Sequence, residues 1–201
     1  MKPISSTTPT SSTLNSSALN SPKTSTPKPP LTATREILLP GGSDHTLRTL
    51  LYNLFTIGNR MEEVRRYLGS TIGITGPQFS LLMAVLELQG VSGVSVGKIA
   101  EYLHVAGTFV TAESAKLAQI DYVEKRTDPR DRRVSLLRVL PAGMAAVDAL
   151  LPELQHTNDT FFELESREGF ESLCSAADRL VDGSRKVLTR IRENSVRSVG
   201  A

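Results

Sequence analysis

The sequence predicts a mainly α-helical fold with one small β-hairpin, flanked by a long helix at each end. Apolar residues recur three and four apart over residues 47–68 and again over residues 170–191, which is the spacing of amphipathic helices. Between these segments, residues 122–139 place β-branched and aromatic residues on both sides of a Thr-Asp-Pro sequence that is typical of a turn. The chain has 201 residues, of which 39% are hydrophobic, so we expect a single folded domain over residues 41–201.

The first 40 residues are predicted to form a disordered tail. They are rich in Ser, Thr and Pro and have almost no apolar periodicity, so they bury too little apolar surface to offset the entropy lost on folding. No apolar stretch follows a basic start, and no apolar run has the length of a membrane span. We therefore expect neither a secretory signal nor a membrane segment, and we predict a cytoplasmic protein.

Cys174 is the only cysteine, which excludes an intramolecular disulfide and a Cys/His cluster for a metal ion. We predict no metal and no cofactor. Cys174 lies early in the last predicted helix, close to apolar residues, and we expect it to be buried as a small hydrophobic side chain. The alternative is a redox-sensing thiol, which needs a helix N-terminus or basic residues beside it.

The first predicted helix covers residues 45–70 and carries an apolar seam held over three heptads. A seam of this length requires a helical partner. Its members are Leu47, Leu50, Leu54, Ile57, Met61, Val64 and Leu68.

A second helix is predicted to begin after Thr75, because Thr75 followed by Pro77 and Gln78 is a helix-capping pattern. Glycines at positions 90 and 93 then interrupt the chain. The residues expected to face inward from this helix are Phe79, Leu82, Val85, Leu86 and Leu88.

Three elements are predicted between this break and the hairpin. They are a short strand at residues 94–96, a short amphipathic helix that contains Ile99 and Leu103, and a further helix over residues 107–120. Val110 and Leu117 are expected to anchor that further helix to the core.

Two helices are predicted after the hairpin. The first begins at Pro141, which suits a first helical turn, and continues past Phe161. We assign residues 45–70 and 142–194 to dimerisation, because each terminal seam is longer than a compact winged domain of about 70 residues covers. The alternative is that the two seams pair within one chain.

Residues 75–140 have the element order of a winged helix-turn-helix: a short helix, a tight turn, a second helix and a basic β-hairpin. In this arrangement the second helix enters the major groove of DNA, and the hairpin, or wing, reaches the neighbouring minor groove. Residues 122–139 carry six basic against three acidic side chains, whereas the formal charge of the whole chain is only +2. This local concentration of positive charge favours a phosphate backbone as the partner.

The segment over residues 75–136 resembles the MarR family of transcription regulators, the multiple antibiotic resistance regulators. The specific element of the resemblance is the wing sequence Asp-Pro-Arg-Asp-Arg-Arg at residues 128–133. The matching sequences are Thr75-Gly-Pro-Gln-Phe-Ser-Leu-Leu, Val96-Gly-Lys-Ile-Ala-Glu-Tyr-Leu-His-Val, Phe109-Val-Thr, Leu117 and Arg130-Asp-Arg-Arg-Val-Ser-Leu.

The resemblance implies a homodimer that binds a pseudo-palindromic DNA operator through paired recognition helices and wings, with half-sites about 10 base pairs apart. It also implies a repressor that leaves its operator when a small ligand, an aromatic acid or its coenzyme A thioester, changes the spacing of the two winged helices. Within the wing, it implies that Asp131 and Arg133 matter most.

The recognition helix departs from the family pattern, since Ala112 stands where relatives usually have a basic residue. Alanine and threonine side chains cannot make the two-point contact with guanine that arginine makes. We therefore expect the wing to supply most of the affinity, and DNA shape to supply part of the specificity. Asp121 replaces the glycine that commonly follows this helix, and aspartate tolerates left-handed backbone geometry.

Within the wing, Asp131 can fix one guanidinium by a bidentate pair and leave another free to enter a narrow minor groove. The alternative is that Asp131 only offsets repulsion among the arginines. The residues predicted to contact DNA are Thr108, Thr111, Ala112, Ala115 and Lys116 of the recognition helix, and Lys125, Arg126, Arg130, Asp131, Arg132 and Arg133 of the wing.

An acidic effector needs cationic donors beside apolar walls, and in the family such pockets lie between the dimerisation helices and the winged helix. Taken singly, each candidate has a simpler explanation as a solvated polar group beside the apolar seam. The candidates are His45, Tyr52, Arg60, Arg65 and Arg66.

Two other functional classes compete with a regulator. An enzyme finds little support, because the three histidines are scattered and neither a phosphate-binding glycine loop nor a nucleophile motif is present. A protein-interaction or architectural DNA-binding dimer without an effector is the alternative, and the weakly basic recognition helix motivates it. The lysines of the tail add a second question: a passive solvated tail is favoured over non-specific attraction to DNA.

Overall fold

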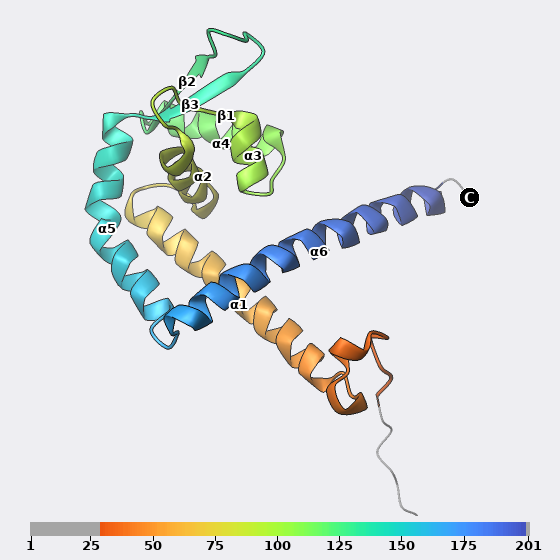
Figure 1. Cartoon of the computed structure of the whole chain (residues 1–201). Helices are drawn as coiled ribbons and strands as arrows, with labels where there is room; N and C mark the ends of the chain where they lie inside the picture. The colour runs from red at the N-terminus through yellow and green to blue at the C-terminus, as the bar shows by residue number, and fades with distance from the viewer. Residues whose placement is uncertain (1–28, 200–201) are drawn as a thin grey trace, which may run out of the picture. The chain divides into compact units, whose positions relative to one another are not determined.

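The structure is a computed structural model that describes residues 29–199 (Figure 1). The chain divides into two compact units, residues 1–53 and residues 54–201, and each is described by itself. As predicted, the fold is mainly α-helical with a small β-wing. In the described residues the elements are η1 (Glu36–Leu38), η2 (Pro40–Gly42), α1 (His45–Thr71), α2 (Gly76–Leu88), β1 (Val94–Ser95), α3 (Val96–Tyr102), α4 (Gly107–Gln119), β2 (Val123–Thr127), β3 (Ser135–Val139), α5 (Pro141–Phe161) and α6 (Arg167–Val199).

The first unit is organised around Asp44, the residue before α1. The carboxylate of Asp44 accepts hydrogen bonds from the backbone N and the Oγ1 of Thr32, both at 2.7 Å, and from Nε of Arg48 at 3.1 Å. These bonds, those from Thr32 first, lower the pKa of Asp44 to about 2. Arg48 also donates to the carbonyl of Pro30 at 2.6 Å, so the chain before α1 is tied back to the helix.

The predicted disorder of residues 1–40 falls partly on residues 1–28, which lie outside the described residues. From residue 36 to the end of the predicted tail at residue 40 the structure differs from that prediction, because one 3-10 turn forms at Glu36–Leu38 and a second begins at Pro40. Composition alone did not anticipate them, since it ignores both the local backbone bonds of the turns and the hydrogen bonds that Asp44 supplies nearby.

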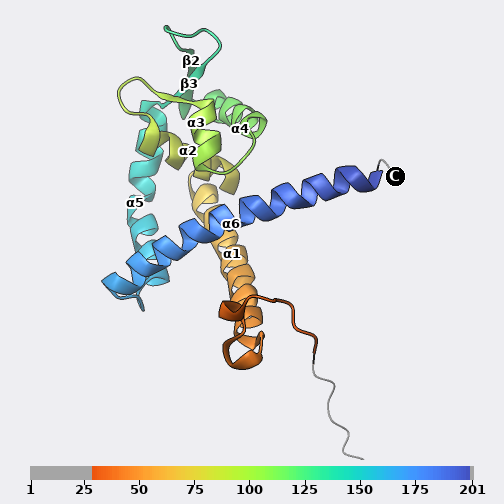
Figure 2. The same ribbon diagram turned by 45° about the vertical axis from the view of Figure 1, so that its right-hand side comes forward.

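The core of the second unit lies where α2, α3 and α4 pack against a small sheet. The sheet has the strand order β1-β3-β2, and both pairs of neighbours are antiparallel. Leu82 of α2, Ile99 of α3, Leu117 of α4 and Leu137 of β3 are fully buried. In both views the β2–β3 hairpin projects beyond α3 and α4 (Figures 1 and 2), so one core holds the wing beside the recognition helix.

The N-terminus of α2 has the cap that its sequence predicts. The Oε1 of Gln78 accepts a hydrogen bond from the backbone N of Thr75 at 2.9 Å, and the Oγ1 of Thr75 accepts one from the backbone N of Gln78 at 3.4 Å. This reciprocal capping box satisfies two backbone donors that a helix start leaves free. It fixes the start of α2 beside α1.

The apolar seam predicted for α1 is covered only in part by the described chain. Leu68 is buried in the core of the second unit, and Val64 packs against that core. By contrast, Leu54, Ile57 and Met61 are between 38% and 52% exposed. A period of three and four residues identifies an apolar face, but it does not distinguish an intrachain neighbour from a partner chain.

The prediction that Cys174 is buried is wrong for the single chain, because its side chain is exposed on α6. The apolar face of α6 has the predicted spacing, yet Leu173, Leu180, Val187 and Ile191 are each about half exposed. The face that contains these residues has no cover within the described chain.

Two tight backbone positions support the base of the wing. Asp121, after α4, has a φ of 57°, which is the left-handed geometry expected for the residue that replaces glycine. Gly143 lies in the first turn of α5, and a Cβ there would overlap the carbonyl oxygen of Tyr122. That carbonyl also accepts a hydrogen bond from the backbone N of Leu140 at 3.0 Å, so the entry and exit of the hairpin are held together.

Candidate nucleic-acid interface and effector cavity

The turn of the wing is shaped by two aspartates. The Oδ1 of Asp128 accepts a hydrogen bond from the backbone N of Arg130 at 2.8 Å, and the Oδ1 of Asp131 accepts one from the backbone N of Arg133 at 2.9 Å. Both are aspartate turns, in which a short acidic side chain bonds the backbone two residues ahead. A backbone bond from Asp128 to the carbonyl of Val134, at 2.9 Å, closes the turn.

The predicted bidentate pair between Asp131 and an arginine is not what the structure shows. Among the described ion pairs, Asp131 takes part in none, and its carboxylate bonds the backbone instead. The physical reason is distance along the chain, because the amide two residues ahead lies within reach of the carboxylate in a tight turn. The role of Asp131 is therefore to shape the turn that carries the arginines.

The basic side chains predicted for the wing are exposed and surround this turn. In the described ion pairs, only Arg126 among them has an acidic partner, Glu124, at 2.7 Å. Guanidinium groups held on a fixed turn without carboxylate partners are suited to phosphate oxygens and to a narrow minor groove. The exposed basic residues are Lys125, Arg126, Arg130, Arg132 and Arg133.

The recognition helix α4 has the orientation that the sequence predicts. Val110 and Leu117 are buried, so the opposite face is open to solvent. That face carries small and neutral side chains beside one lysine. Its predicted members Thr108, Thr111, Ala112, Ala115 and Lys116 are all exposed.

Lys116 is not a free cation, and this was not predicted. Its Nζ lies 2.7 Å from Oε1 of Glu113, one turn earlier on the same helix. The other oxygen of Glu113 accepts a hydrogen bond from Nε2 of Gln78 on α2, at 3.1 Å. Sequence spacing of three residues hints at the first contact, but nothing in the sequence indicates the second.

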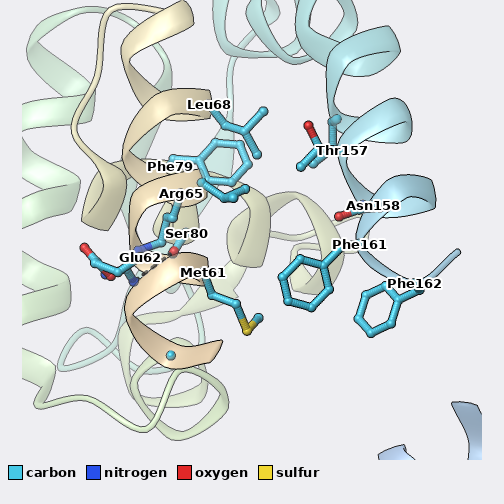
Figure 3. Close-up of a pocket in the computed structure, with 13 residues that line it drawn as sticks. Met61, Glu62, Arg65, Leu68, Phe79, Ser80, Thr157, Asn158, Phe161 and Phe162 are labelled. Atoms are coloured by element: carbon cyan, nitrogen blue, oxygen red, sulfur yellow. Dashed lines mark hydrogen bonds and ion pairs between the residues drawn. The ribbon is translucent and has the colours of Figure 1, made fainter. Parts of the chain in front are cut away.

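A cavity of about 400 Å³ lies in the second unit between α1, α2 and α5 (Figure 3). Its walls are mainly apolar, with a few polar groups, which is the usual composition of a small-molecule site. The lining residues are Gly58, Met61, Glu62, Val64, Arg65, Leu68, Phe79, Ser80, Leu154, Thr157, Asn158, Phe161 and Phe162.

Arg65 is the one predicted effector residue that lines this cavity. It pairs with Glu62 and donates to Oγ of Ser80 at 3.2 Å, while its Nε is buried without a hydrogen-bond partner in the described structure. Arg60 and Arg66 lie on the same helix but do not line the cavity. They are five positions before and one position after Arg65, so their side chains point to other sides of α1. His45 and Tyr52 belong to the first unit and are not among the residues that line the cavity.

No sequence pattern pointed to the aromatic wall of the cavity. Phe79 was assigned to the core, and it both packs in the core and faces the cavity. Phe161 and Phe162 pack edge-to-face at the end of α5, with ring centroids 5.0 Å apart, and Phe162 makes a similar contact with Phe170 of α6. Only the packing of α5 near α1 and α2 identifies them as lining residues.

Residues 29–199 contain no group of three or more His, Cys, Asp or Glu side chains placed to hold a metal ion. No single helix in that range is both long and apolar enough to cross a membrane, although α1 and α2, bent by 80° where they meet, jointly have the length and composition.

A short helix, a turn, an exposed second helix and a projecting basic hairpin together define a winged helix-turn-helix protein. A family model described as the MarR family matches residues 72–134, which extend from the end of α1 to the turn of the wing. This segment therefore matches the MarR family, as its sequence predicted, and its winged helix-turn-helix is a fold of DNA-binding transcription regulators.

Solved structures with the same fold cover most of the described chain. S. aureus MepR in a complex with DNA has 18% identity and a TM-score of 0.58, over 66% of this chain and 94% of that one. A MarR protein from Peptoclostridium difficile has 15% identity and a TM-score of 0.59, over 71% and 91%. The PcaV regulator of Streptomyces coelicolor with its natural ligand has 18% identity and a TM-score of 0.52, over 77% and 99%. No curated protein matches the sequence.

Proposed function

We propose that the protein is a homodimeric repressor that occupies a pseudo-palindromic operator and leaves it when a small aromatic acid or its coenzyme A thioester binds. The observation that carries the DNA-binding part is the wing, where two aspartates bond the backbone and leave the arginines exposed. A regulator of this kind acts where its DNA lies, so a cytoplasmic location belongs to the same proposal.

The wing supplies most of the affinity in this proposal. Exposed guanidinium groups release counterions from the DNA when they bind phosphate, so binding weakens steeply as salt rises. The exposed face of α4 contributes contacts to thymine methyl groups and phosphates through Thr111 and Ala112. S. aureus MepR, which shares the fold, has been crystallised with DNA, and this supports the same use of the winged helix here.

Uncovered apolar surface supports the homodimer. On α6, Leu180, Val187 and Ile191 are each at least half exposed, with a spacing that matches one face of a helix. Contiguous apolar surface of this kind marks an interaction site in a soluble chain, and a two-fold dimer covers the same face on both subunits. In light scattering on the full chain we expect a dimer, and Leu180→Glu should convert it to a monomer. A wild-type monomer would contradict the dimer.

The cavity beside Arg65 is the proposed effector site. Its volume of about 400 Å³ suits a single aromatic ring with a carboxylate, so an aromatic acid fits inside whereas the nucleotide part of a coenzyme A thioester would extend outside. The buried, unpartnered Nε of Arg65 is available to a carboxylate, and Met61 and Phe161 supply apolar walls. The PcaV relative, solved with its natural ligand, supports ligand binding in this fold.

The effector is tested by isothermal titration of the full chain with benzoic acids and their coenzyme A thioesters. Arg65→Met should abolish the binding of any acid that the wild type binds, since it removes the cation and keeps the length of the side chain. Arg66→Met is the matched control, because Arg66 is exposed on the same helix and lies outside the cavity. No binding by the wild type, or equal binding by both variants, would remove this site from consideration.

The DNA-binding proposal is tested by fluorescence anisotropy at low salt, with duplexes from the protein's own promoter region and with random duplexes. Tight binding to one promoter duplex and a large loss in Arg133→Ala support an operator-binding repressor. Arg167→Ala, at the start of α6, controls for the loss of one positive charge. The proposal is wrong if the wild type shifts no duplex and Arg133→Ala changes nothing.

One observation favours a second candidate, an architectural DNA-binding or protein-interaction dimer without an effector. The only basic residue of α4 is paired with Glu113, so the helix presents no free cation for a base edge. Equal affinity for promoter and random duplexes would support the architectural role, and binding to neither would support the interaction role.

A further inference from the structure

Gln78 joins the start of α2 to the middle of the recognition helix α4. It is only 9% exposed, and both ends of its side-chain amide are used. Its oxygen accepts from the backbone N of Thr75, so the nitrogen must be the end that faces α4. That nitrogen donates to the carboxylate of Glu113 at 3.1 Å. The orientation of the amide is therefore set by the helix cap.

Glu113 in turn has its two carboxylate oxygens committed to different partners. One oxygen accepts from Gln78, and the other lies 2.7 Å from Nζ of Lys116. The side chain of Glu113 is 13% exposed, whereas that of Lys116 is 56% exposed. Since an exposed ion pair between residues three apart on a helix contributes little to stability, its main effect is on the charge that α4 presents.

We propose that Gln78 and Glu113 are positioning residues that hold Lys116 away from the DNA backbone, so that α4 approaches the major groove without a free cation. The proposal rests on the DNA-binding function proposed above and adds how its specificity arises. A free lysine on α4 would bind phosphates of any sequence and raise non-specific affinity. With Lys116 paired, the sequence discrimination of α4 depends on contacts that Thr108, Thr111 and Ala112 make with base edges, and on the sequence-dependent shape of the DNA.

The same chain of contacts begins at the wall of the cavity. Phe79 and Ser80, the two residues after Gln78, line the cavity, and Ser80 accepts a hydrogen bond from Arg65. A displacement of α2 at the cavity would therefore move the amide that holds Glu113. This places the pair Gln78 and Glu113 between the proposed effector site and the recognition helix.

Glu113→Gln is the decisive variant, because it keeps the size of the side chain and removes its charge. Fluorescence anisotropy with promoter and random duplexes is measured over a series of salt concentrations. We expect tighter binding to both duplexes, a lower ratio of promoter to random affinity, and a salt slope steeper by about 0.9 for each lysine released. Glu113→Gln combined with Lys116→Met should return the slope to that of the wild type.

Gln78→Glu separates positioning from charge. Glutamate keeps the capping box with Thr75. It replaces the amide nitrogen that donates to Glu113 by an oxygen, so two carboxylates face each other. We expect Gln78→Glu to lower promoter affinity without steepening the salt slope. The reciprocal pair Gln78→Glu with Glu113→Gln restores one hydrogen bond in the opposite direction but leaves Lys116 without its carboxylate. Promoter affinity should therefore recover relative to Gln78→Glu, while the salt slope stays steep and the ratio of promoter to random affinity stays low. If Gln78 had only a structural role, promoter affinity and the salt slope would change together in these variants.

Glu87→Gln is the control for losing one negative charge, since Glu87 is exposed at the end of α2. An unchanged salt slope in Glu113→Gln, with a wild type that binds the promoter and an Arg133→Ala variant that does not, would overturn this inference alone. A wild type that binds no duplex would overturn the proposed function and this inference together. A slope that changes equally in Glu87→Gln would also overturn the inference, because the effect would then be one of net charge.

Discussion

The wing and the recognition helix α4 belong to one core, yet they present opposite kinds of surface. The acidic residues of the wing turn, Asp128 and Asp131, bond the backbone, and among the described ion pairs Arg130, Arg132 and Arg133 have no acidic partner. The acidic residue of α4, Glu113, instead pairs with the only lysine of that helix. The difference shows that an acidic side chain among basic ones either exposes or removes positive charge, depending on which donor lies nearest.

The wing and α4 are therefore expected to contribute to DNA recognition in different ways. Phosphate contacts position a protein on DNA, and contacts to base edges specify the sequence. We assign positioning to the wing and specification to α4 and to DNA shape. Variants of either element should therefore change affinity, salt dependence and discrimination in different proportions.

The largest effect is expected for Arg132→Ala combined with Arg133→Ala. Removing an arginine that binds a base edge costs about 1–3 kcal/mol, so the loss of two should cost at least about 2 kcal/mol and lower operator affinity at least about thirtyfold in anisotropy measurements. The salt slope should also become shallower. Thr108→Ala combined with Thr111→Ala is the comparison on α4, and an equal loss of salt dependence there would end the proposed division.

Ala112→Arg adds a free cation to α4 and should have the next largest effect. We expect random duplexes to bind about tenfold more tightly, with a salt slope steeper by about 1 per subunit, because the new guanidinium binds a phosphate. Competition anisotropy with promoter and random duplexes measures the change. A tighter affinity confined to one operator sequence would show that the arginine contacts a guanine, which would shift specification further toward α4.

Gly143→Ala tests the support at the base of the wing. The new Cβ would overlap the carbonyl oxygen of Tyr122, and overpacking of this kind costs about 1–3 kcal/mol of unfolding free energy. Urea denaturation followed by circular dichroism measures the loss. Gly97→Ala is the control, since no atom lies near a Cβ at that position. Equal stability of the two variants would mean that the backbone at the base of the wing moves enough to accommodate the added Cβ.

Asp131→Ala removes one hydrogen bond from the turn of the wing and keeps every arginine. One such bond contributes about 0.5–1.5 kcal/mol, so operator affinity should fall several-fold while the salt slope stays close to that of the wild type. Hydrogen exchange of the Arg133 amide should quicken in the same variant. A higher operator affinity would instead show that Asp131 acts through its charge and not through the shape of the turn.

The smallest effect on DNA binding is expected at Asp44, which lies in the first unit. Hydrogen bonds lower the pKa of Asp44 to about 2, so the bonds from Thr32 are fully present above the unfolded pKa of about 3.9 and are lost as pH falls toward 2. Exchange of the Thr32 amide should quicken over that window, beyond the change expected for a free amide. Asp44→Asn should give fast exchange at neutral pH with unchanged DNA affinity.

Local signals explain why so much of the fold was predictable. The cap at Thr75 and Gln78, the left-handed position of Asp121 and the buried anchors Val110 and Leu117 all follow from a residue and its near neighbours. The exposed face of α4 followed from the same periodicity. The wing was predictable because its turn chemistry and its arginines are contiguous in the chain.

The candidate effector site was harder to predict, because its walls come from three helices that are distant in sequence. Arg65 was named together with His45, Tyr52, Arg60 and Arg66, and only Arg65 lines the cavity. A helix places adjacent residues on different sides, and a set of basic residues beside a seam does not say which side faces α5. Cys174 was misplaced for a related reason, since the seam of α6 lacks cover in the described chain.

Periodicity, capping and turn chemistry act over a few residues, so the winged helix-turn-helix, its match to the MarR family over residues 72–134 and the exposed arginines of the wing follow from the amino-acid order alone. Which charges are free depends instead on how the helices pack. Gln78 and Glu113 are 35 residues apart and meet at 3.1 Å because α2 packs against α4. A hydrogen bond requires that distance and direction, and no local pattern encodes either for residues on two different helices.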